Sequence, residues 1–283
     1  ILLTRYFFIQ QMSTDPNKLQ NYVLPLKVKP EHKKDGDVIF YIDQKLVNRK
    51  DEIALGLMLI SNRQLFGEVY RHLIGEYFYQ MGPNSGVLIR PFAKSQDILS
   101  NLSFPGDIDL LIIPYEDGRL VVSKTLAIEL KILRAKFSNQ KKSPNEFGFS
   151  QASGLLNAGF PYVAVVHLIV SDTSPEDAWR EILMAKVIDA DSGAIELLGN
   201  EKKDMMPADL IQRSFGRLKA HSLDENLGLL SCYMESENNN AIWSPMGQTA
   251  KFNSQSSLQT FERIADYYYE NYKFFLDTKR YND

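Results

Sequence analysis

The chain has 283 residues, of which 44% are hydrophobic and 24% charged, and its formal net charge is −3. This composition is typical of a globular protein with enough residues to bury a substantial core. The net charge excludes a global attraction to polyanions, so a nucleic-acid partner would need a local basic patch. The single cysteine, Cys232, excludes an intrachain disulfide and a cysteine-rich zinc site, and it fits a reducing compartment.

Targeting signals are absent from the first residues. The opening stretch "ILLTRYFFIQQ" is apolar but too short to cross a bilayer, and it lacks the basic start and cleavage site of a signal peptide. Every other apolar run is also shorter than a membrane span. We therefore expect a soluble cytoplasmic protein with no membrane partner.

The first half of the chain predicts a helical segment followed by strands. Residues 13–50 are polar and mixed, with a strand or two expected around Ile39. A helix is predicted over 52–81, with a break near Ser61-Asn62, and "MGPNSG" ends it. Strands rich in Leu, Ile and Val are predicted after it, with a hairpin turn at Asp117-Gly118. These strands lie at 86–92, 107–114 and 120–132.

The second half begins with a short helix that ends near Gly159, followed by the most apolar strand, "YVAVVHLIVSD". Further on, a capped helix is expected from Ser174, a surface loop at 234–241, and an aromatic-rich helix over 256–280. Apolar runs on both sides of a helix indicate an α/β fold, with a mixed β-sheet flanked by helices. We expect a single domain, 1–283, with a core at about 60–175 and a C-terminal addition at 176–283.

Four charged residues stand in or beside two apolar runs: Asp107 and Asp109 in the first, Glu129 and Lys131 in the second. Alternate residues of a strand share a face, so each pair points one way. Pairing of the two strands through the hairpin would bring the charges together at one end of the sheet. Neighbouring carboxylates repel each other and are costly to bury, and a divalent cation such as Mg²⁺ removes that cost. Lys131 would then hold an attacking water or offset developing charge.

This pattern resembles the core signature of the PD-(D/E)xK nuclease superfamily, over roughly residues 65–172. "GDIDLLI" followed by "AIELK" matches the Asp of one strand and the Glu-x-Lys of the next. The resemblance implies a restriction-endonuclease-like core in which Asp109 and Glu129 bind metal and Lys131 is catalytic. Pro105 is separated from Asp109, so the literal Pro-Asp pair is absent.

Two flanking residues follow from the same resemblance. Members often carry a Glu on the preceding helix, which Glu68 in "FGEVYRHL" matches, and a Gln or Lys on the following helix, which Gln151 in "SQASGLLNAG" matches. The implied metal ligands are then Asp109, Glu129 and Glu68, with Gln151 assisting the catalytic set. The implied cofactor is Mg²⁺ or Mn²⁺.

The segment from Lys131 to Lys142 contains five basic residues and no acid. Lys and Arg side chains neutralise the phosphate charges of a nucleic acid, and they are needed beside an acidic metal centre that would otherwise repel the backbone. We therefore expect this segment to contact nucleic acid. The residues expected to make them are Arg134, Lys136, Lys141 and Lys142. The aromatic residues of "DYYYENYKFF" favour core packing or a subunit contact, which would give a homodimer or larger complex through the C-terminal helix.

Each candidate has an ordinary structural alternative. Asp109 could face solvent at a strand end, and Glu129 could form a half-buried ion pair with Lys131 or with the nearby arginine. The stripe that contains Glu68 could be the solvated side of an amphipathic helix, and the basic segment a solvated loop. His167 lies mid-strand among apolar neighbours, so we expect a hydrogen-bonded core histidine rather than a ligand.

The function expected from this reading is metal-dependent hydrolysis of nucleic-acid phosphodiester bonds, with DNA favoured over RNA as the substrate. The main alternative is a catalytically inactive nuclease-fold protein that acts as a nucleic-acid- or protein-binding subunit. A third class is a structural protein that interacts through the aromatic C-terminal helix. A measurement of Mn²⁺ binding distinguishes the active nuclease from the inactive nuclease-fold protein.

Overall fold

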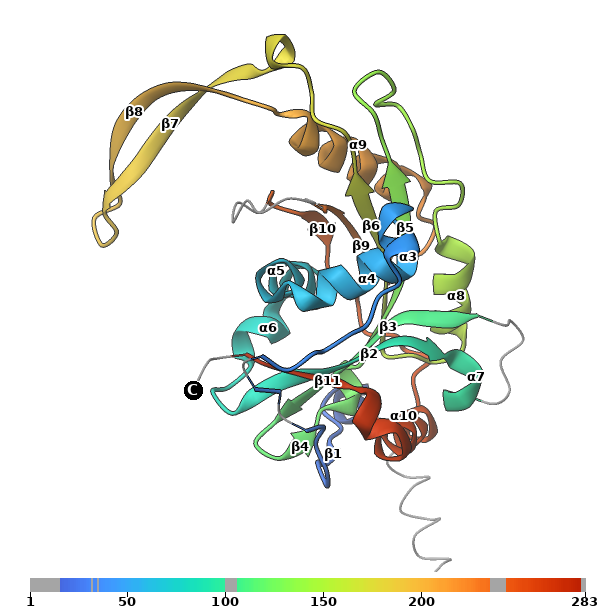
Figure 1. The fold of residues 1–283 in the computed structure, drawn as a ribbon. Helices are drawn as coiled ribbons and strands as arrows, with labels where there is room; N and C mark the ends of the chain where they lie inside the picture. Colours follow the sequence, from blue (N-terminus) through green and yellow to red (C-terminus); the bar gives the residue numbers. More distant parts are fainter. Residues whose placement is uncertain (1–15, 32, 35, 100–105, 235–242, 281–283) are drawn as a thin grey trace, which may run out of the picture.

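The computed structural model describes residues 16–31, 33–34, 36–99, 106–234 and 243–280. Within these residues, nine strands form one mixed sheet with helices on both faces (Figure 1). The strands are β1 (Leu24–Pro25), β2 (Ser85–Lys94), β3 (Asp107–Glu116), β4 (Arg119–Leu120), β5 (Leu126–Arg134), β6 (Tyr162–Val170), β9 (Gly228–Tyr233), β10 (Met246–Gln248) and β11 (Leu276–Lys279). A second sheet contains only β7 (Arg180–Asp189) and β8 (Ala194–Lys203).

Among the five central strands, only β3 runs opposite to the others. β2, β3 and β5 are antiparallel neighbours, whereas β5, β6 and β9 are parallel. Parallel neighbours need crossover connections, which helices supply here. Every residue of β6 is buried, as expected for a strand covered on both faces.

The helices are α2 (Pro16–Gln20), α3 (Gln44–Asn48), α4 (Glu52–Ser61), α5 (Arg63–Ile74), α6 (Glu76–Gln80), α7 (Ser95–Ile98), α8 (Phe149–Asn157), α9 (Met206–His221) and α10 (Leu258–Asn271). Short 3₁₀ turns cover Val122–Lys124, Glu176–Ala178 and Tyr272–Phe274. Helices α4 and α5 pack on one face of the sheet, and α8 and α10 pack on the other. The expected α/β class, a mixed sheet flanked by helices, is confirmed.

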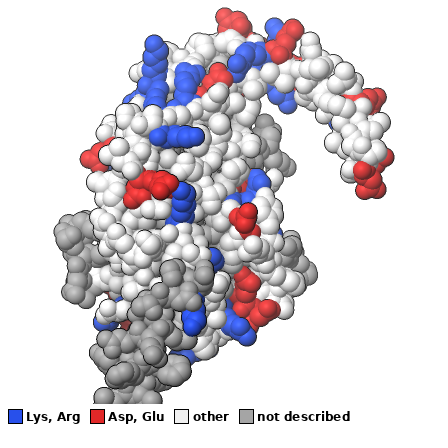
Figure 2. Space-filling model, turned by 180° about the vertical axis from the view of Figure 1, so that it is seen from behind, with Lys and Arg blue, Asp and Glu red and all other residues white. Residues whose placement is uncertain are grey.

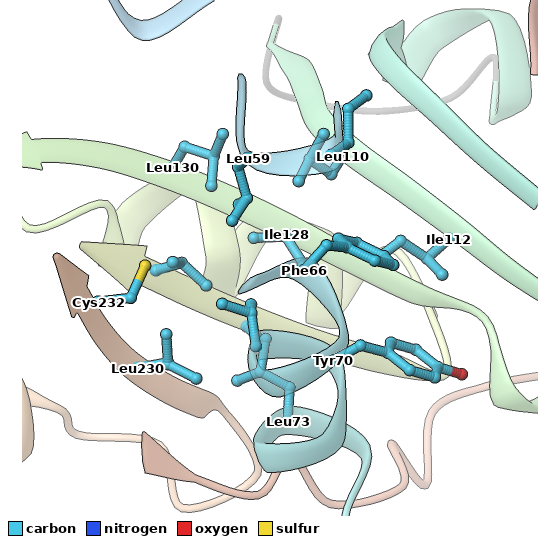
Figure 3. Packing of buried hydrophobic residues seen from close by; sticks show 14 of the residues in the cluster. Leu59, Phe66, Tyr70, Leu73, Leu110, Ile112, Ile128, Leu130, Leu230 and Cys232 are labelled. Atoms are coloured by element: carbon cyan, nitrogen blue, oxygen red, sulfur yellow. The ribbon is translucent and has the colours of Figure 1, made fainter. Parts of the chain in front are cut away.

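Two separate cores hold the layers together. Figure 3 shows the first, in which Leu59 and Phe66 of the helices pack against Leu110 and Ile128 of the sheet. The second core lies on the opposite face and contains Tyr268 of α10. Of the aromatic residues in the C-terminal segment, Tyr267, Tyr268 and Phe275 are core residues, the first of the two roles expected for them, whereas Phe274 is exposed.

The helical segment after residue 51 breaks where the sequence predicts. Asn62 ends α4, and its side chain then accepts a hydrogen bond from the backbone N–H of Leu65, at 3.0 Å, to cap α5. Asp51 caps α4 in the same way through the N–H of Ile53, at 3.1 Å. The hairpin turn is also where expected: Asp117 and Gly118 both have positive φ, as a two-residue turn requires.

Three expected elements are wrong. The described residues around Ile39 form no strand, and a short helix, α3, begins at Gln44. The segment from Ser174 is not a long helix, because a single 3₁₀ turn leads into strand β7. The C-terminal helix ends at Asn271, and β11 then pairs with β2. The predicted loop at 234–241 lies almost wholly outside the described residues.

Candidate active site

Asp109 and Glu129 face each other across two central strands. Strands β3 and β5 pair from Leu110↔Ile128 onward, and extending this register by one residue sets Asp109 opposite Glu129. Opposed residues of neighbouring strands share a face. Both side chains are buried, with 8% of Asp109 and 1% of Glu129 exposed. Asp109 Oδ2 also accepts a hydrogen bond from the backbone N–H of Leu130, at 2.6 Å.

Lys131 supplies the positive charge of this cluster. Its Nζ lies 2.6 Å from Glu129 Oε1 and 3.9 Å from Glu52 Oε1. Glu52 is the first residue of α4, so the helix start is held over the end of β5. Two carboxylates, Glu129 and Glu52, therefore contact one ammonium group, and Asp109 faces Glu129 across the strands. We call Glu52, Asp109, Glu129 and Lys131 the carboxylate cluster.

The electrostatics of the cluster disfavour ionised carboxyl groups. Burial is the main cause that raises the pKa of Asp109, and the charge of Glu129 raises it further. Burial also raises the pKa of Glu129, although the hydrogen bond and charge of Lys131 act in the opposite direction. Partial burial alone would lower the pKa of Lys131, but Glu129, Glu52 and Asp109 outweigh it and raise that pKa. The cluster carries more negative charge than its lysine balances.

One carboxylate oxygen has no donor. Glu129 Oε2 is buried and lacks a hydrogen-bond partner among the described residues. A buried carboxylate oxygen without a donor is costly. Because burial raises the pKa of both Asp109 and Glu129, a proton shared between the two carboxyl groups would relieve this cost, and so would a bound cation.

The start of α8 is packed against the cluster. Gly148, the N-cap of this helix, has φ +86. A Cβ at this position would lie 3.0 Å from Glu129 Cγ and 3.3 Å from Lys131 Cγ. Glycine therefore lets the helix start approach the strand closely.

A hollow of about 370 Å³ lies beside the cluster. Charged residues from three segments line it: Glu52 at the start of α4, Lys131 and Arg134 of β5, and Glu146 before α8. The half-buried Lys131 joins this hollow to the buried carboxylates. Solvent and ligands can thus reach the cluster from the side of Lys131 and Glu52.

The structure brings some of the expected site residues together and leaves others apart. Asp109, Glu129 and Lys131 meet, and Gln151 lies half-buried in the first turn of α8, the helix whose cap packs on Glu129. Glu68 instead pairs with Arg71 on α5, and among the described residues no contact joins it to the cluster. The carboxylate from a preceding helix is Glu52, which the sequence analysis missed. Asp107 is exposed.

His167 is a hydrogen-bonded core residue, as expected. Its Nδ1 lies 3.0 Å from Ser214 Oγ and its Nε2 lies 3.4 Å from the carbonyl oxygen of Phe147. Ser214 Oγ also accepts a hydrogen bond from Ser231 Oγ, at 2.9 Å. Burial lowers the pKa of His167 to about 4, so the ring is neutral at physiological pH.

The basic segment forms a surface loop beyond the cluster. Lys136, Lys141 and Lys142 are exposed there, as is Arg134 at the end of β5. Lys and Arg side chains gather at the upper left of Figure 2, the end of the molecule where this loop lies.

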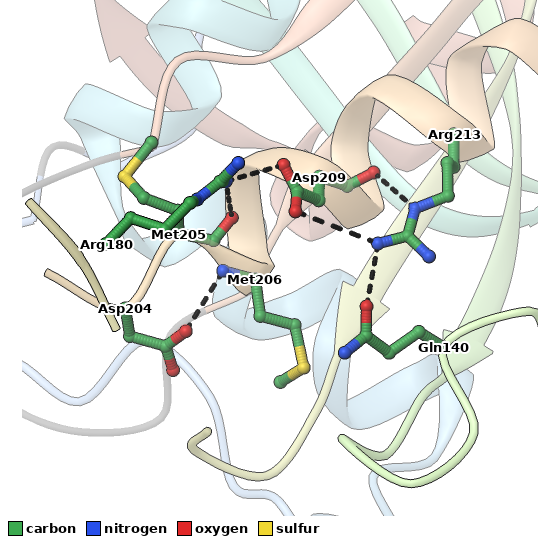
Figure 4. A network of polar contacts seen from close by, with 7 residues as sticks. All are labelled: Gln140, Arg180, Asp204, Met205, Met206, Asp209 and Arg213. Atoms are coloured by element: carbon green, nitrogen blue, oxygen red, sulfur yellow. Dashed lines mark hydrogen bonds and ion pairs between the residues drawn. The ribbon is translucent and has the colours of Figure 1, made fainter. Parts of the chain in front are cut away.

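Two arginines of α9 hold this loop in place. Arg213 donates to Gln140 Oε1 at 2.7 Å, and Arg217 donates to the carbonyl oxygen of Lys142 at 2.6 Å (Figure 4 shows the first). Residues at i and i+4 of a helix lie on the same face, so the sequence could have predicted that Arg213 and Arg217 point toward one common partner.

The comparisons with known proteins found no counterpart: no family model, no curated protein and no solved structure matches the chain. Among the described residues, no group of three or more His, Cys, Asp or Glu side chains is arranged to hold a metal ion. The cluster thus offers two buried carboxylates, with Glu52 at its rim. None of the helices in the described ranges has the length and apolar character needed to cross a membrane.

Proposed function

We propose that this chain is a metal-dependent nuclease with a restriction-endonuclease-like core, and that the carboxylate cluster is its active site. One observation carries the proposal: Glu129 and Glu52 both contact Lys131, and the buried Asp109 lies across from Glu129, whose Oε2 has no hydrogen-bond partner in the part of the chain that the structure describes. The order of elements supports it. Helices α4 and α5 precede strand β3 with its Asp, and β5 with its Glu-x-Lys is followed by α8 and the parallel strand β6.

Asp109 and Glu129 would hold a Mg²⁺ or Mn²⁺ ion, since Mg²⁺ typically takes one or two carboxylates and keeps several waters. The ion would supply activation of a bound water and charge neutralisation at the phosphate. The chain's own groups do the positioning. Glu129 fixes the Lys131 ammonium at 2.6 Å, where it can hydrogen-bond a water or phosphate oxygen that enters from the hollow.

Binding of the nucleic acid would fall to the basic loop. Its exposed lysines, Lys136, Lys141 and Lys142, and the nearby Arg134 can contact successive phosphates without reading base sequence. The arginines of α9 hold this loop, so its cations are presented on an ordered segment. Gln151, in the first turn of α8, would help to orient the phosphate or the water.

A second candidate function is that of an inactive nuclease-fold subunit that binds nucleic acid or protein. Two observations favour it: the net charge of −3, and the three acids that line the hollow, Asp51, Glu52 and Glu146. Such a protein would keep the fold and the basic loop while lacking cleavage.

The test uses supercoiled plasmid, single-stranded DNA and single-stranded RNA with Mg²⁺ or Mn²⁺. We expect the wild type to cleave DNA, with Lys131→Ala and Asp109→Asn each reducing the rate by about 100-fold or more. Glu68→Gln is the matched control, because Glu68 is an acid outside the cluster, and its rate should equal that of the wild type.

Calorimetry with Mn²⁺ separates the two candidates. Cation binding that is lost in Asp109→Asn, without cleavage by the wild type, would identify the inactive subunit. Absence of both binding and cleavage in the wild type would overturn the assignment of the cluster as an active site.

A further inference from the structure

Strands β7 and β8 form a two-stranded arm that extends away from the body of the protein (Figure 1). Nearly all of its residues are exposed, and its strands pair with each other and with no other strand of the described chain. A single two-stranded hairpin is marginally stable in water, so an arm of this length needs cover for its apolar residues.

One face of the arm is apolar. Val187 pairs with Ile195 and Ala185 pairs with Leu197, so these four side chains share a face, and alternation along β7 adds Leu183. Their exposure is high, from 59% for Leu183 and Ile195 to 64% for Val187. The opposite face carries the cross-strand ion pair between Lys186 and Glu196, at 2.6 Å, and also Ile182 and Met184. The face that contains Val187 and Leu197 is therefore the more apolar of the two, and it has no partner among the described residues.

The charges of the arm argue against an anionic partner. Residues 180–203 contain five acids and four basic residues. The tip, residues 187–195, holds two aspartates and no basic residue, and red atoms mark the end of the arm in Figure 2. A phosphate backbone or an anionic membrane would select for cations along the whole arm.

The apolar area is of the size that a pair of arms requires. Four aliphatic side chains exposed by about 60%, together with Ala185, present on the order of 500 Å². Two such faces in contact would bury about 1,000 Å², the lower bound for a specific protein interface. An isologous contact of this kind closes with two copies and does not propagate.

The base of the arm is fixed to the body, so the arm points in a defined direction. Asp204 accepts hydrogen bonds from Ser174 N–H at 2.8 Å and Met206 N–H at 3.0 Å, and thus joins the two ends of the arm. Arg180 Nη2 lies 2.7 Å from Asp209 Oδ1 on α9 (Figure 4). A ribbon held at its base loses little orientational freedom when it pairs.

We propose that the arm is a dimerisation element: its apolar face pairs with the same face of the arm of a second copy about a two-fold axis. This goes beyond the proposed nuclease function, and its test is independent of cleavage.

Sedimentation velocity of the full chain measures the association. We expect the wild type to dimerise at micromolar concentration, and the double variant Val187→Lys, Leu197→Lys to weaken the dimer by at least about 100-fold. Lys186→Ala is the control variant, because Lys186 lies on the same strand but on the opposite face of the arm. It should leave the dimer intact. Circular dichroism confirms that each variant is folded.

A wild type that stays monomeric at about 100 µM, where interfaces of this size associate, overturns the proposal. So does a dimer that survives the apolar-face variant, or a monomer that instead binds anionic vesicles.

Discussion

A single added methyl group at Gly148 should disturb the carboxylate cluster without removing any of its charges. Gly148 caps α8 in a left-handed conformation with φ +86, and its Cα lies against the stems of Glu129 and Lys131. Gly148→Ala therefore introduces two separate costs, one in the backbone and one in packing.

The structure gives the size of both costs. An L-residue in the left-handed region costs about 1–2 kcal/mol. The new Cβ would also lie 3.0 Å from Glu129 Cγ, below the separation at which carbon atoms attract. Since Glu129 is only 1% exposed, the side chain cannot move into solvent, and overpacking of this kind adds about 1 kcal/mol or more. We expect a total loss of about 2–3 kcal/mol in the free energy of unfolding.

Gly118→Ala separates the two costs. Gly118 has φ +73, and an added Cβ there would meet no atom within 4 Å, so this variant carries the backbone cost alone. Urea denaturation should show Gly148→Ala to be less stable than Gly118→Ala by about 1 kcal/mol. The cleavage rate with Mn²⁺ should fall at least about 10-fold in Gly148→Ala and stay unchanged in Gly118→Ala. The reason is that a displacement of about 1 Å of a reacting group can lower the rate by orders of magnitude. Equal stability and equal cleavage in the two variants would refute the packing of α8 onto the cluster.

Three further outcomes are expected. Glu52→Gln should lower cleavage by about 10-fold by releasing one contact of Lys131, with kcat more affected than KM, and an unchanged rate would remove Glu52 from the cluster. Because burial lowers the pKa of His167 to about 4, the folded state resists protonation. Stability should therefore be full above about pH 6.5 and fall by about 3 kcal/mol as the pH drops to 4, whereas His167→Asn should show a flatter profile in chemical denaturation. Ile112→Ala, in the core between sheet and helices, should cost about 2–5 kcal/mol in urea denaturation, and a loss below 1 kcal/mol would contradict its burial.

The centre of the fold was predictable because it is made of local signals. Strands β3, β5 and β6 are near-continuous runs of Leu, Ile and Val, and the helix break at Asn62 has a side-chain cap signature. The second break, at Gly75, was not predicted. Asp109, Glu129 and Lys131 were identifiable because a charged side chain in an apolar strand is costly to bury unless it is paired or binds a ligand. Their meeting follows from the alternation of strand side chains and from the antiparallel pairing.

The parts that were missed depend on contacts distant in sequence or on ambiguous signals. Ser174 followed by Pro175 and acids imitates a helix start, but the residues after them pair with β8 as a strand. The last strand is defined by its pairing with β2, almost two hundred residues earlier, which no local pattern reveals. An acid in the first turn of a helix is usually a solvated dipole partner, so Glu52 gave no sign that it reaches Lys131.

The bond from the Leu130 amide to Asp109 gives the protein a spectroscopic probe of its own. In an ordinary ladder, the acceptor of such an amide is a carbonyl oxygen, whose electron density hardly responds to the solution. Here the acceptor is a carboxylate, and its electron density falls when it shares a lone pair with a proton or a cation. The nuclear magnetic resonance of this one backbone proton should therefore shift during a Mg²⁺ titration of isotopically labelled wild-type protein, with no dye or tag attached.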